Sequence, residues 1–181
     1  MRIGIFFLCL FFCNNVISCK KEDAVNKNKI NITIGALLSL TGNWSTLGLT
    51  SQESMNQAIN DINSYMAQTG SAYRFSSLVF DTKLDTILAQ KAIKETLGKN
   101  IHCVIGPQSS AELGAIRTFA NSNNILIVSQ GSTAGSLAIA DDALFRFCPG
   151  DAVEGKAMAQ TIYNSGLRSL ITLARNDVGN C

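Results

Sequence analysis

The sequence contains few of the residues on which common catalytic and metal sites depend. It has one histidine, His102, and no closely spaced pair of cysteine and histidine residues, which argues against a zinc site. His102 begins a predicted strand whose far end is followed by serine residues, and such a strand spans about 13 Å. A Ser-His-Asp arrangement is therefore out of hydrogen-bond reach. We expect neither a metal site nor catalytic residues.

Phosphate-binding motifs and an excess of basic charge are also lacking. The loop at residues 39–44 matches neither G-x-G-x-x-G nor G-x-x-x-x-G-K, so phosphate binding has no support and no cofactor is expected. Without residues 1–18, the chain has 14 basic and 13 acidic residues, a net charge of +1. No basic stripe is present, which argues against nucleic acid as a partner.

The N-terminal residues have the pattern of a secretory segment. The apolar run at residues 3–12 is too short to cross a bilayer, which needs about 20 residues, so residues 1–18 are predicted to be a signal peptide. The stretch V-I-S-C at residues 16–19 resembles the lipobox of bacterial lipoproteins. The resemblance implies that Cys19 is acylated and anchors the protein to a membrane. The alternative is an ordinary signal peptide with a chance cysteine.

Residues 19–29 are rich in lysine and asparagine and have no apolar period, so they predict a flexible tether. The K-K-E-D stretch after Cys19 resembles an export signal of surface lipoproteins in some Gram-negative lineages, although a solvated run of charges explains it equally well. The protein is expected in the cell envelope, facing the periplasm or the cell surface. Farther along, Cys103 and Cys148 are expected to lie too far apart to bond, with Cys103 a buried thiol.

From residue 30 onward, short β-rich runs alternate with helical periodicity. Strands are predicted at residues 30–38, 75–80, 102–105, 125–128, 144–147 and 169–173, and helices at 51–67, 85–99, 110–122 and 151–164. This alternation predicts an α/β fold with a Rossmann-like parallel sheet and helices on both faces. The lobe spans residues 30–181, and we expect the chain to be truncated, because it stops where a strand would turn into its next helix.

Hydroxyl-bearing residues follow two neighbouring predicted strands. The segment G-P-Q-S-S at residues 106–110 follows one strand, and S-Q-G-S-T at residues 129–133 follows the next. Ligands of open parallel sheets bind beyond the carboxyl ends of the strands. The two segments are therefore expected to meet and to bind a compact solute that carries a carboxylate. The candidate ligand-binding residues are Ser109, Ser110, Gly131, Ser132 and Thr133.

Each candidate also has a purely structural interpretation. Ser109 or Ser110 could cap the helix that begins there, an effect of about 1 kcal/mol. The G-S-T segment could form a turn held by its own side chains. Trp44, the only tryptophan, could line the ligand site or pack beneath its own loop. Asp151 is expected to cap the helix that follows it, with a place at the rim of the site as the alternative.

Taken in order, these segments resemble landmarks of one protein family. I-G-A-L-L-S-L-T-G at residues 34–42, the two hydroxyl segments, and F-R-F-C-P-G-D at residues 145–151 resemble the Leu/Ile/Val-binding periplasmic proteins of type I. Members of that family have two Rossmann-like lobes that close on the ligand, and they serve ABC importers of branched-chain amino acids, amides and related solutes. The resemblance implies that this chain is the N-terminal lobe and that the second lobe is missing.

The resemblance also assigns roles to four residues of the candidate site. It implies that Ser110 binds the carboxylate of the ligand through its hydroxyl and its backbone. Gly131 and Ser132 would provide main-chain contacts, and Thr133 would help to hold the α-amino group. These roles point to an amino acid as the ligand.

The sequence thus predicts a lipid-anchored, extracytoplasmic solute-binding protein that is not an enzyme and that delivers a small ligand to an ABC permease. A ligand sensor of the same fold, which passes occupancy to a signalling partner, is the alternative among binding modules. An enzyme on a doubly wound sheet is the other alternative, but it would need a titratable pair at the strand ends, and the sequence shows none.

Overall fold

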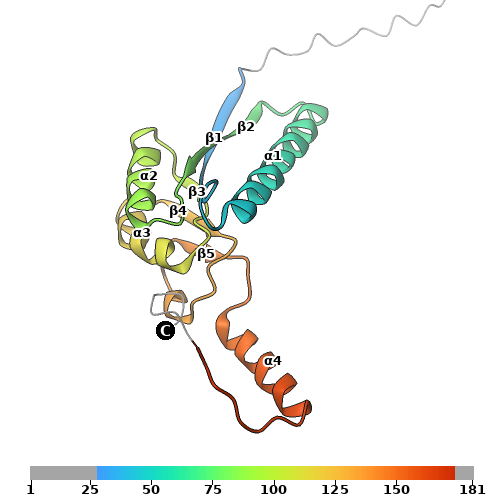
Figure 1. Cartoon of the computed structure of the whole chain (residues 1–181). Helices are drawn as coiled ribbons and strands as arrows, with labels where there is room; N and C mark the ends of the chain where they lie inside the picture. The colour runs from blue at the N-terminus through green and yellow to red at the C-terminus, as the bar shows by residue number, and fades with distance from the viewer. Residues whose placement is uncertain (1–27, 174–181) are drawn as a thin grey trace, which may run out of the picture.

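Five parallel strands form one sheet in the computed structural model of the chain, which describes residues 28–173 (Figure 1). The strands lie in the order β2-β1-β3-β4-β5. Their bounds are Ile30–Leu38 for β1, Tyr73–Asp81 for β2, Cys103–Ile105 for β3, Leu126–Ser129 for β4 and Leu144–Arg146 for β5. The predicted signal peptide, Cys19, Cys181 and most of the predicted tether lie outside the described residues.

Helices cover both faces of this sheet, as the alternation of elements predicts. The helix α1 (Ser45–Gln68) packs on one face, and α2 (Thr86–Gly98) and α3 (Ser110–Ser122) pack on the other (Figure 1). A short 3-10 turn, Gly135–Leu137, follows β4, and α4 (Asp151–Asn164) follows β5. The predicted α/β fold with a Rossmann-like parallel sheet is therefore confirmed.

Alternation along β1 separates two apolar clusters. Leu37 faces α2 and α3, whereas its neighbours Ala36 and Leu38 lie on the side of α1 and pack with Met55. Successive side chains of a strand point to opposite faces, and here both faces are covered. The buried members of the larger cluster, on the α2 and α3 side, are Leu37, Ala89, Ala92, Ile93, Val104, Leu113, Ile116, Ala120, Ile125, Ile127, Ala134 and Leu137.

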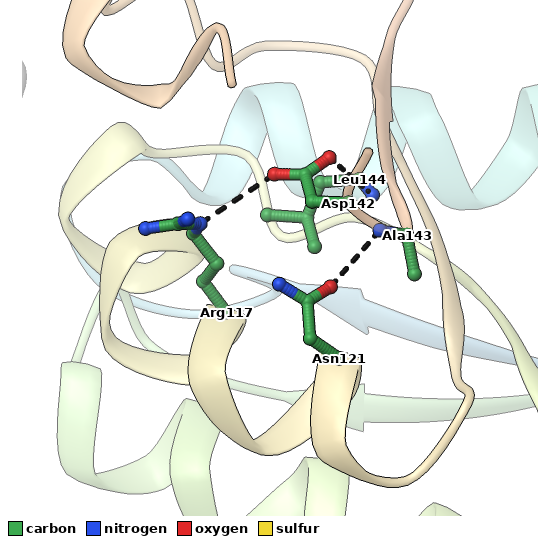
Figure 2. Close-up of polar contacts among 5 residues, drawn as sticks. All are labelled: Arg117, Asn121, Asp142, Ala143 and Leu144. Carbon is green, nitrogen blue, oxygen red and sulfur yellow. Dashed lines mark hydrogen bonds and ion pairs between the residues drawn. The ribbon is translucent and has the colours of Figure 1, made fainter. Parts of the chain in front are cut away.

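The helix α3 also fixes the position of β5 (Figure 2). Arg117 Nε lies 3.5 Å from Asp142 Oδ2, and the Asp142 side chain is only 5% exposed. Asn121 Oδ1 accepts a hydrogen bond of 2.9 Å from Ala143 N, and Asp142 Oδ1 accepts one of 3.0 Å from Leu144 N. Breaking a buried ion pair leaves an uncompensated charge, so this cluster resists displacement of β5 from α3.

The predicted sixth strand does not form. Residues 169–173 lie outside any strand, and Ile171 and Leu173 are 92% and 95% exposed. A strand needs a neighbouring edge to satisfy its backbone, and α4, which precedes this segment, buries none of its residues. Because α4 does not pack on the sheet, it does not return the chain to a sheet edge. No helix within residues 28–173 combines the length and the apolar character needed to cross a membrane.

The helix α1 begins at Ser45, earlier than the predicted start at residue 51. The apolar period that signals this helix begins at Met55, so its first turns carry no such signal. Those turns instead pack tightly on the end of β1, where a Cβ added to Gly48 would lie 1.9 Å from the carbonyl oxygen of Ser39. Gly48 thus allows α1 to approach the strand-end loop closely.

We expect Gly48→Ala to lower the free energy of unfolding by about 1–3 kcal/mol, because the added methyl group forces α1 away from Ser39. Gly155→Ala, in α4, is the matched control, since a Cβ there meets nothing within 4 Å. That change should leave stability unchanged or raise it by up to about 1 kcal/mol. Urea unfolding followed by circular dichroism measures both. Equal effects of the two substitutions would contradict the close approach.

Candidate functional site

The order of the strands reverses between β1 and β3, and a hydrogen bond joins the loops that follow these two strands. The strand β1 leads outward to β2 on one side, whereas β3, β4 and β5 follow on the other. The crevice beyond the carboxyl ends of strands at such a switch point is where ligands of open α/β sheets bind. Gln108 Oε1 accepts a hydrogen bond of 3.0 Å from Ser39 N, and Gln108 is buried. The loops after β1 and β3 are thereby held together.

The first turn of α3 is closed by the side chains of Ser109 and Glu112. Ser109 is the N-cap, and its Oγ accepts a hydrogen bond of 3.2 Å from Glu112 N. The same hydroxyl donates to Glu112 Oε2 at 2.6 Å, and both residues are buried. The spacing is that of a capping box, in which the glutamate bonds to the backbone N–H of the serine, but here Glu112 accepts from the serine hydroxyl instead. The hydroxyl of Ser109 is therefore used within the helix cap.

The two hydroxyl segments meet, as the sequence predicts. Ser110 Oγ lies 3.0 Å from Ser132 Oγ, and Ala134 N donates to Ser110 Oγ at 3.3 Å. Gly131 lies so close to Gln108 that an added Cβ would be 2.5 Å from its carbonyl oxygen. The close approach that the sequence suggests for Gly131 is thus an approach to protein backbone. We call Ser110, Gly131, Ser132 and Thr133 the strand-end site.

The strand-end site presents hydrogen-bond donors that have no partner among residues 28–173. Ser110 is the first residue of α3, so its N–H has no acceptor within the helix. Neither the N–H nor the hydroxyl of Thr133 bonds to another residue between 28 and 173. Free N–H groups at the start of a helix bind anions well, because the helix dipole adds to them. The arrangement suits a carboxylate.

The start of α4 lies against this site. Asp151 N donates to Thr133 O at 3.0 Å, so the first residue of α4 lies beside the loop after β4. The N-cap of α4 is Gly150, and no side chain caps the helix. The expectation that Asp151 caps α4 is therefore wrong, because the helix includes Asp151 as its first residue. The backbone of Asp151 lies next to Thr133.

Asp81, at the end of β2, holds the loop that follows β1. Asp81 Oδ1 accepts hydrogen bonds from Leu40 N at 2.9 Å and Thr41 N at 3.3 Å, and Oδ2 accepts from Thr41 Oγ1 at 2.6 Å. Burial alone would raise the pKa of this carboxyl, but these bonds and one from Lys83 N favour the charged form and lower the pKa below its usual value. No local sequence pattern marks Asp81, because its main partners, Leu40 and Thr41, lie about 40 residues earlier in the chain.

Trp44 lies between this loop and α1. It occupies the N-cap position of α1, and its carbonyl accepts a hydrogen bond of 3.0 Å from Gly48 N. Trp44 is half-buried and belongs to neither apolar cluster of the described residues. The interpretation of Trp44 as a residue beside the ligand stays a prediction.

His102, Cys103 and Cys148 are not members of the strand-end site, although the thiol of Cys148 donates to Ser132 O. His102 is exposed before β3, with Nε2 3.3 Å from Asn100 Oδ1. Cys103 and Cys148 are free thiols. Cys103 is partly rather than fully buried, and this burial raises the pKa of its thiol. Between residues 28 and 173, no three residues among His, Cys, Asp and Glu cluster in a way that could hold a metal ion.

The lowered pKa of Asp81 predicts a pH dependence of stability. Because the folded-state pKa lies below the unfolded value, the contribution is present above the unfolded pKa and is lost as the pH falls through the folded one. We expect Asp81→Asn to cost about 1 kcal/mol at pH 7, a modest value because solvent screens the site. Wild type should lose more stability than this variant between pH 5 and pH 3. Urea unfolding at several pH values measures this loss. Asp61→Asn is the control, since Asp61 is an exposed residue of α1. Parallel pH profiles of wild type and Asp81→Asn would contradict it.

The chain resembles known proteins in sequence as well as in fold. Residues 50–181 match the model of the family described as receptor family ligand binding region. An uncharacterised protein of Methanocaldococcus jannaschii is 30% identical over 152 residues, which cover 81% of this chain and 36% of that protein.

Solved structures of similar fold are substrate-binding proteins. The leucine-binding protein LivK from Thermotoga maritima is 25% identical, with a TM-score of 0.66 over 75% of this chain and 38% of its own. The branched-chain amino acid transporter substrate-binding protein LivJ from Streptococcus pneumoniae, in complex with isoleucine, is 22% identical, with a TM-score of 0.67 over 74% and 38%. An ABC transporter substrate-binding protein from Desulfitobacterium hafniense in complex with Leu is 19% identical, with a TM-score of 0.60 over 76% and 40%.

The sequence match and the fold agree. The family match covers most of the described residues, and the parallel sheet superposes on one part of each solved structure. The chain spans only 36–40% of the length of these relatives. The chain belongs to the family described as receptor family ligand binding region, and it has the fold of the N-terminal lobe of a type I periplasmic binding protein.

Proposed function

We propose that residues 30–181 are the N-terminal lobe of an extracytoplasmic solute-binding protein that captures an amino acid for an ABC importer. The observation that carries the proposal is the contact between Ser110 and Ser132, 3.0 Å apart, at the start of α3. This contact places the free N–H of Ser110 and the free donors of Thr133 within one small region. The amino-acid ligands named for the similar solved structures support the same class of ligand.

In this proposal the carboxylate of the ligand lies at the N-terminus of α3. It accepts hydrogen bonds from the hydroxyl and the N–H of Ser110, and the helix dipole stabilises its charge. Gly131 and Ser132 contribute main-chain contacts, whereas Ser109 contributes through its backbone, since its hydroxyl is used in the cap. Main-chain contacts of this kind do not depend on the ligand's side chain, which leaves its identity to other residues.

The ammonium group of the ligand then lies beside Thr133. The hydroxyl of Thr133 can accept from an ammonium group, and the backbone of Asp151, an acidic residue, bonds to Thr133 O. In this proposal the Asp151 carboxylate turns towards the ammonium group. A charge-assisted bond to an ammonium is stronger than a neutral one. Trp44, half-buried at the start of α1, would border the ligand on the side of the first loop.

A second lobe would complete the site. The chain spans 38% of the length of the leucine-binding protein that it resembles, and α4 buries none of its residues within the part of the chain described. Binding sites usually bury most of the surface of a small ligand. One lobe alone would hold the ligand weakly, and closure of a second lobe over it would supply the remaining contacts.

The proposal extends to the membrane. Residues 1–18 would be removed as a lipoprotein signal peptide, Cys19 would carry the lipid, and residues 19–29 would tether the lobe near an ABC permease. The lobe would then act in the cell envelope, in the periplasm or at the cell surface. The motif V-I-S-C at residues 16–19 supports this.

A second candidate function is ligand sensing. The family that the chain matches is described as a receptor ligand-binding region, and a sensor would use the same strand-end site. Such a protein would pass occupancy to a signalling partner instead of a permease. Co-purification of the full-length protein with a permease, as opposed to a signalling module, distinguishes the two functions.

We expect Ser110→Ala in the full-length protein to weaken binding of L-leucine by about 1–3 kcal/mol, because the carboxylate loses a hydroxyl donor. Isothermal titration calorimetry measures the affinity. Ser54→Ala is the control, since Ser54 is exposed on α1 and bonds only to Thr50 O. Wild-type affinity in Ser110→Ala would reject the role given to Ser110.

The lipid anchor has a separate test. In cells fed radiolabelled palmitate, wild type should incorporate the label and fractionate with membranes, because a diacylated cysteine holds a protein at a bilayer. Cys19→Ala should incorporate none and should lose its membrane association. Cys103→Ala is the control, as it lies within β3. Continued labelling of Cys19→Ala would reject lipidation at this residue.

A further inference from the structure

The loop after β4 is held by the segment that follows it in the sheet. Arg146 Nη1 donates to the carbonyls of both Ser132 and Ala134, the former at 3.5 Å. Cys148 Sγ donates to Ser132 O at 3.1 Å, and the carbonyl of Thr133 accepts from the first N–H of α4 at 3.0 Å. All three carbonyls of residues 132–134 are thus bound, whereas the N–H and hydroxyl of Thr133 stay free.

The position of Arg146 is set by the sheet. Arg146 is the last residue of β5 and pairs in register with Ser129, the last residue of β4. The strand itself is held to α3 through the Arg117–Asp142 pair (Figure 2). The guanidinium therefore reaches the loop from a rigid element. This precision is what a residue needs if it is to orient another group.

Within residues 28–173, the charge of Arg146 has no acidic partner. Ion pairs among the described side chains join Lys99 to Glu95 and Arg117 to Asp142, and Arg146 takes part in neither. Arg146 is half-buried, and two carbonyl dipoles are the hydrogen-bond partners of its guanidinium. A partly buried cation that no carboxylate neutralises raises the affinity of its surroundings for an anion.

We infer that Arg146 is a positioning residue of the strand-end site, and that its charge gives the site a preference for ligands with an ionised carboxylate. The inference deepens the proposed function and rests on it for the identity of the ligand. The mechanism has two parts. Arg146 bridges the carbonyls of Ser132 and Ala134 with one nitrogen, so the loop retains the conformation in which Ser132 meets Ser110, and its positive charge favours the anion at the start of α3.

Loss of the guanidinium should loosen the loop, because the buried carbonyls of Ser132 and Ala134 would keep only the weak thiol donor of Cys148 and the N–H of Leu137 at 3.2 Å as partners. A buried carbonyl that loses its strongest donor is destabilised, so the peptide groups would rotate towards better donors. Rotation would displace the Ser132 hydroxyl from Ser110 and the donors of Thr133 from the ligand. A lysine at this position keeps the charge and has three donors, so it should restore much of the function.

The chain contains a matched control. Arg74 also uses Nη1 to donate to two backbone carbonyls, those of Ser71 and Tyr73. It lies at the opposite end of the sheet, near the beginning of β2. Arg74→Met removes the same kind of interaction as Arg146→Met without touching the strand-end site.

The experiment compares Arg146→Met, Arg146→Lys and Arg74→Met in the full-length protein. Amide hydrogen exchange reports on the loop without any ligand, and we expect exchange at residues 131–134 to accelerate about tenfold or more in Arg146→Met alone. Calorimetry with L-leucine and L-leucinamide reports on charge preference, since the amide lacks the carboxylate. Arg146→Met should lower the preference for leucine over leucinamide about tenfold, and Arg146→Lys should largely retain it.

Two results would overturn the inference. One is slow exchange at residues 131–134 together with an unchanged leucine preference in Arg146→Met. The other is an equal loss in Arg74→Met, which would mark a general loss of stability. If the wild-type protein binds neither compound, amino-acid binding is rejected, and the exchange data alone then decide whether Arg146 positions the loop.

Discussion

The hydrogen bond between the hydroxyls of Ser110 and Ser132 is the interaction on which the rest of the site depends. It joins the start of α3 to the loop after β4, two segments that meet only because β3 and β4 are parallel and adjacent. Antiparallel strands would send one loop to the opposite edge of the sheet. Every property proposed for the site, from carboxylate binding to the orientation of Thr133, follows from this alignment.

Around that contact, several buried polar groups bond to one another, whereas Glu112 Oε1 and Gln130 Oε1 have no partner among the described residues. Gln108 binds the backbone after β1, Ser109 closes the helix cap, and Ser129 Oγ donates to Pro107 O at 2.6 Å. Buried polar groups are costly when unpaired, so this network rigidifies the loops in one arrangement. The donors that point to a function are the few that the network leaves unused.

The sequence allowed the elements and the meeting of the two hydroxyl segments to be predicted. The helices α3 and α4 have their predicted bounds, because periodicity and start signals agree there. The sixth strand and the cap by Asp151 were predicted wrongly. A strand depends on a partner edge and a cap depends on where the helix begins, and local composition specifies neither. The contacts of Gln108, Asp81 and Arg146 could not be predicted, because their main partners follow other strands, 12 to 69 residues away in sequence.

By itself, the sequence determined the α/β class, the strands of the sheet and the helices that cover it. It also determined the residue types at the carboxyl edge of the sheet, since hydrophobic period and turn chemistry are local properties. Only the tertiary structure decided which of those residues are free to bind. In the folded chain the Ser109 hydroxyl bonds within the helix cap, the Ser110 hydroxyl bonds to that of Ser132, and Arg146 bonds to the backbone of the loop after β4. The physical reason is that hydrogen-bond partners in a parallel sheet come from different strand ends, brought together by packing.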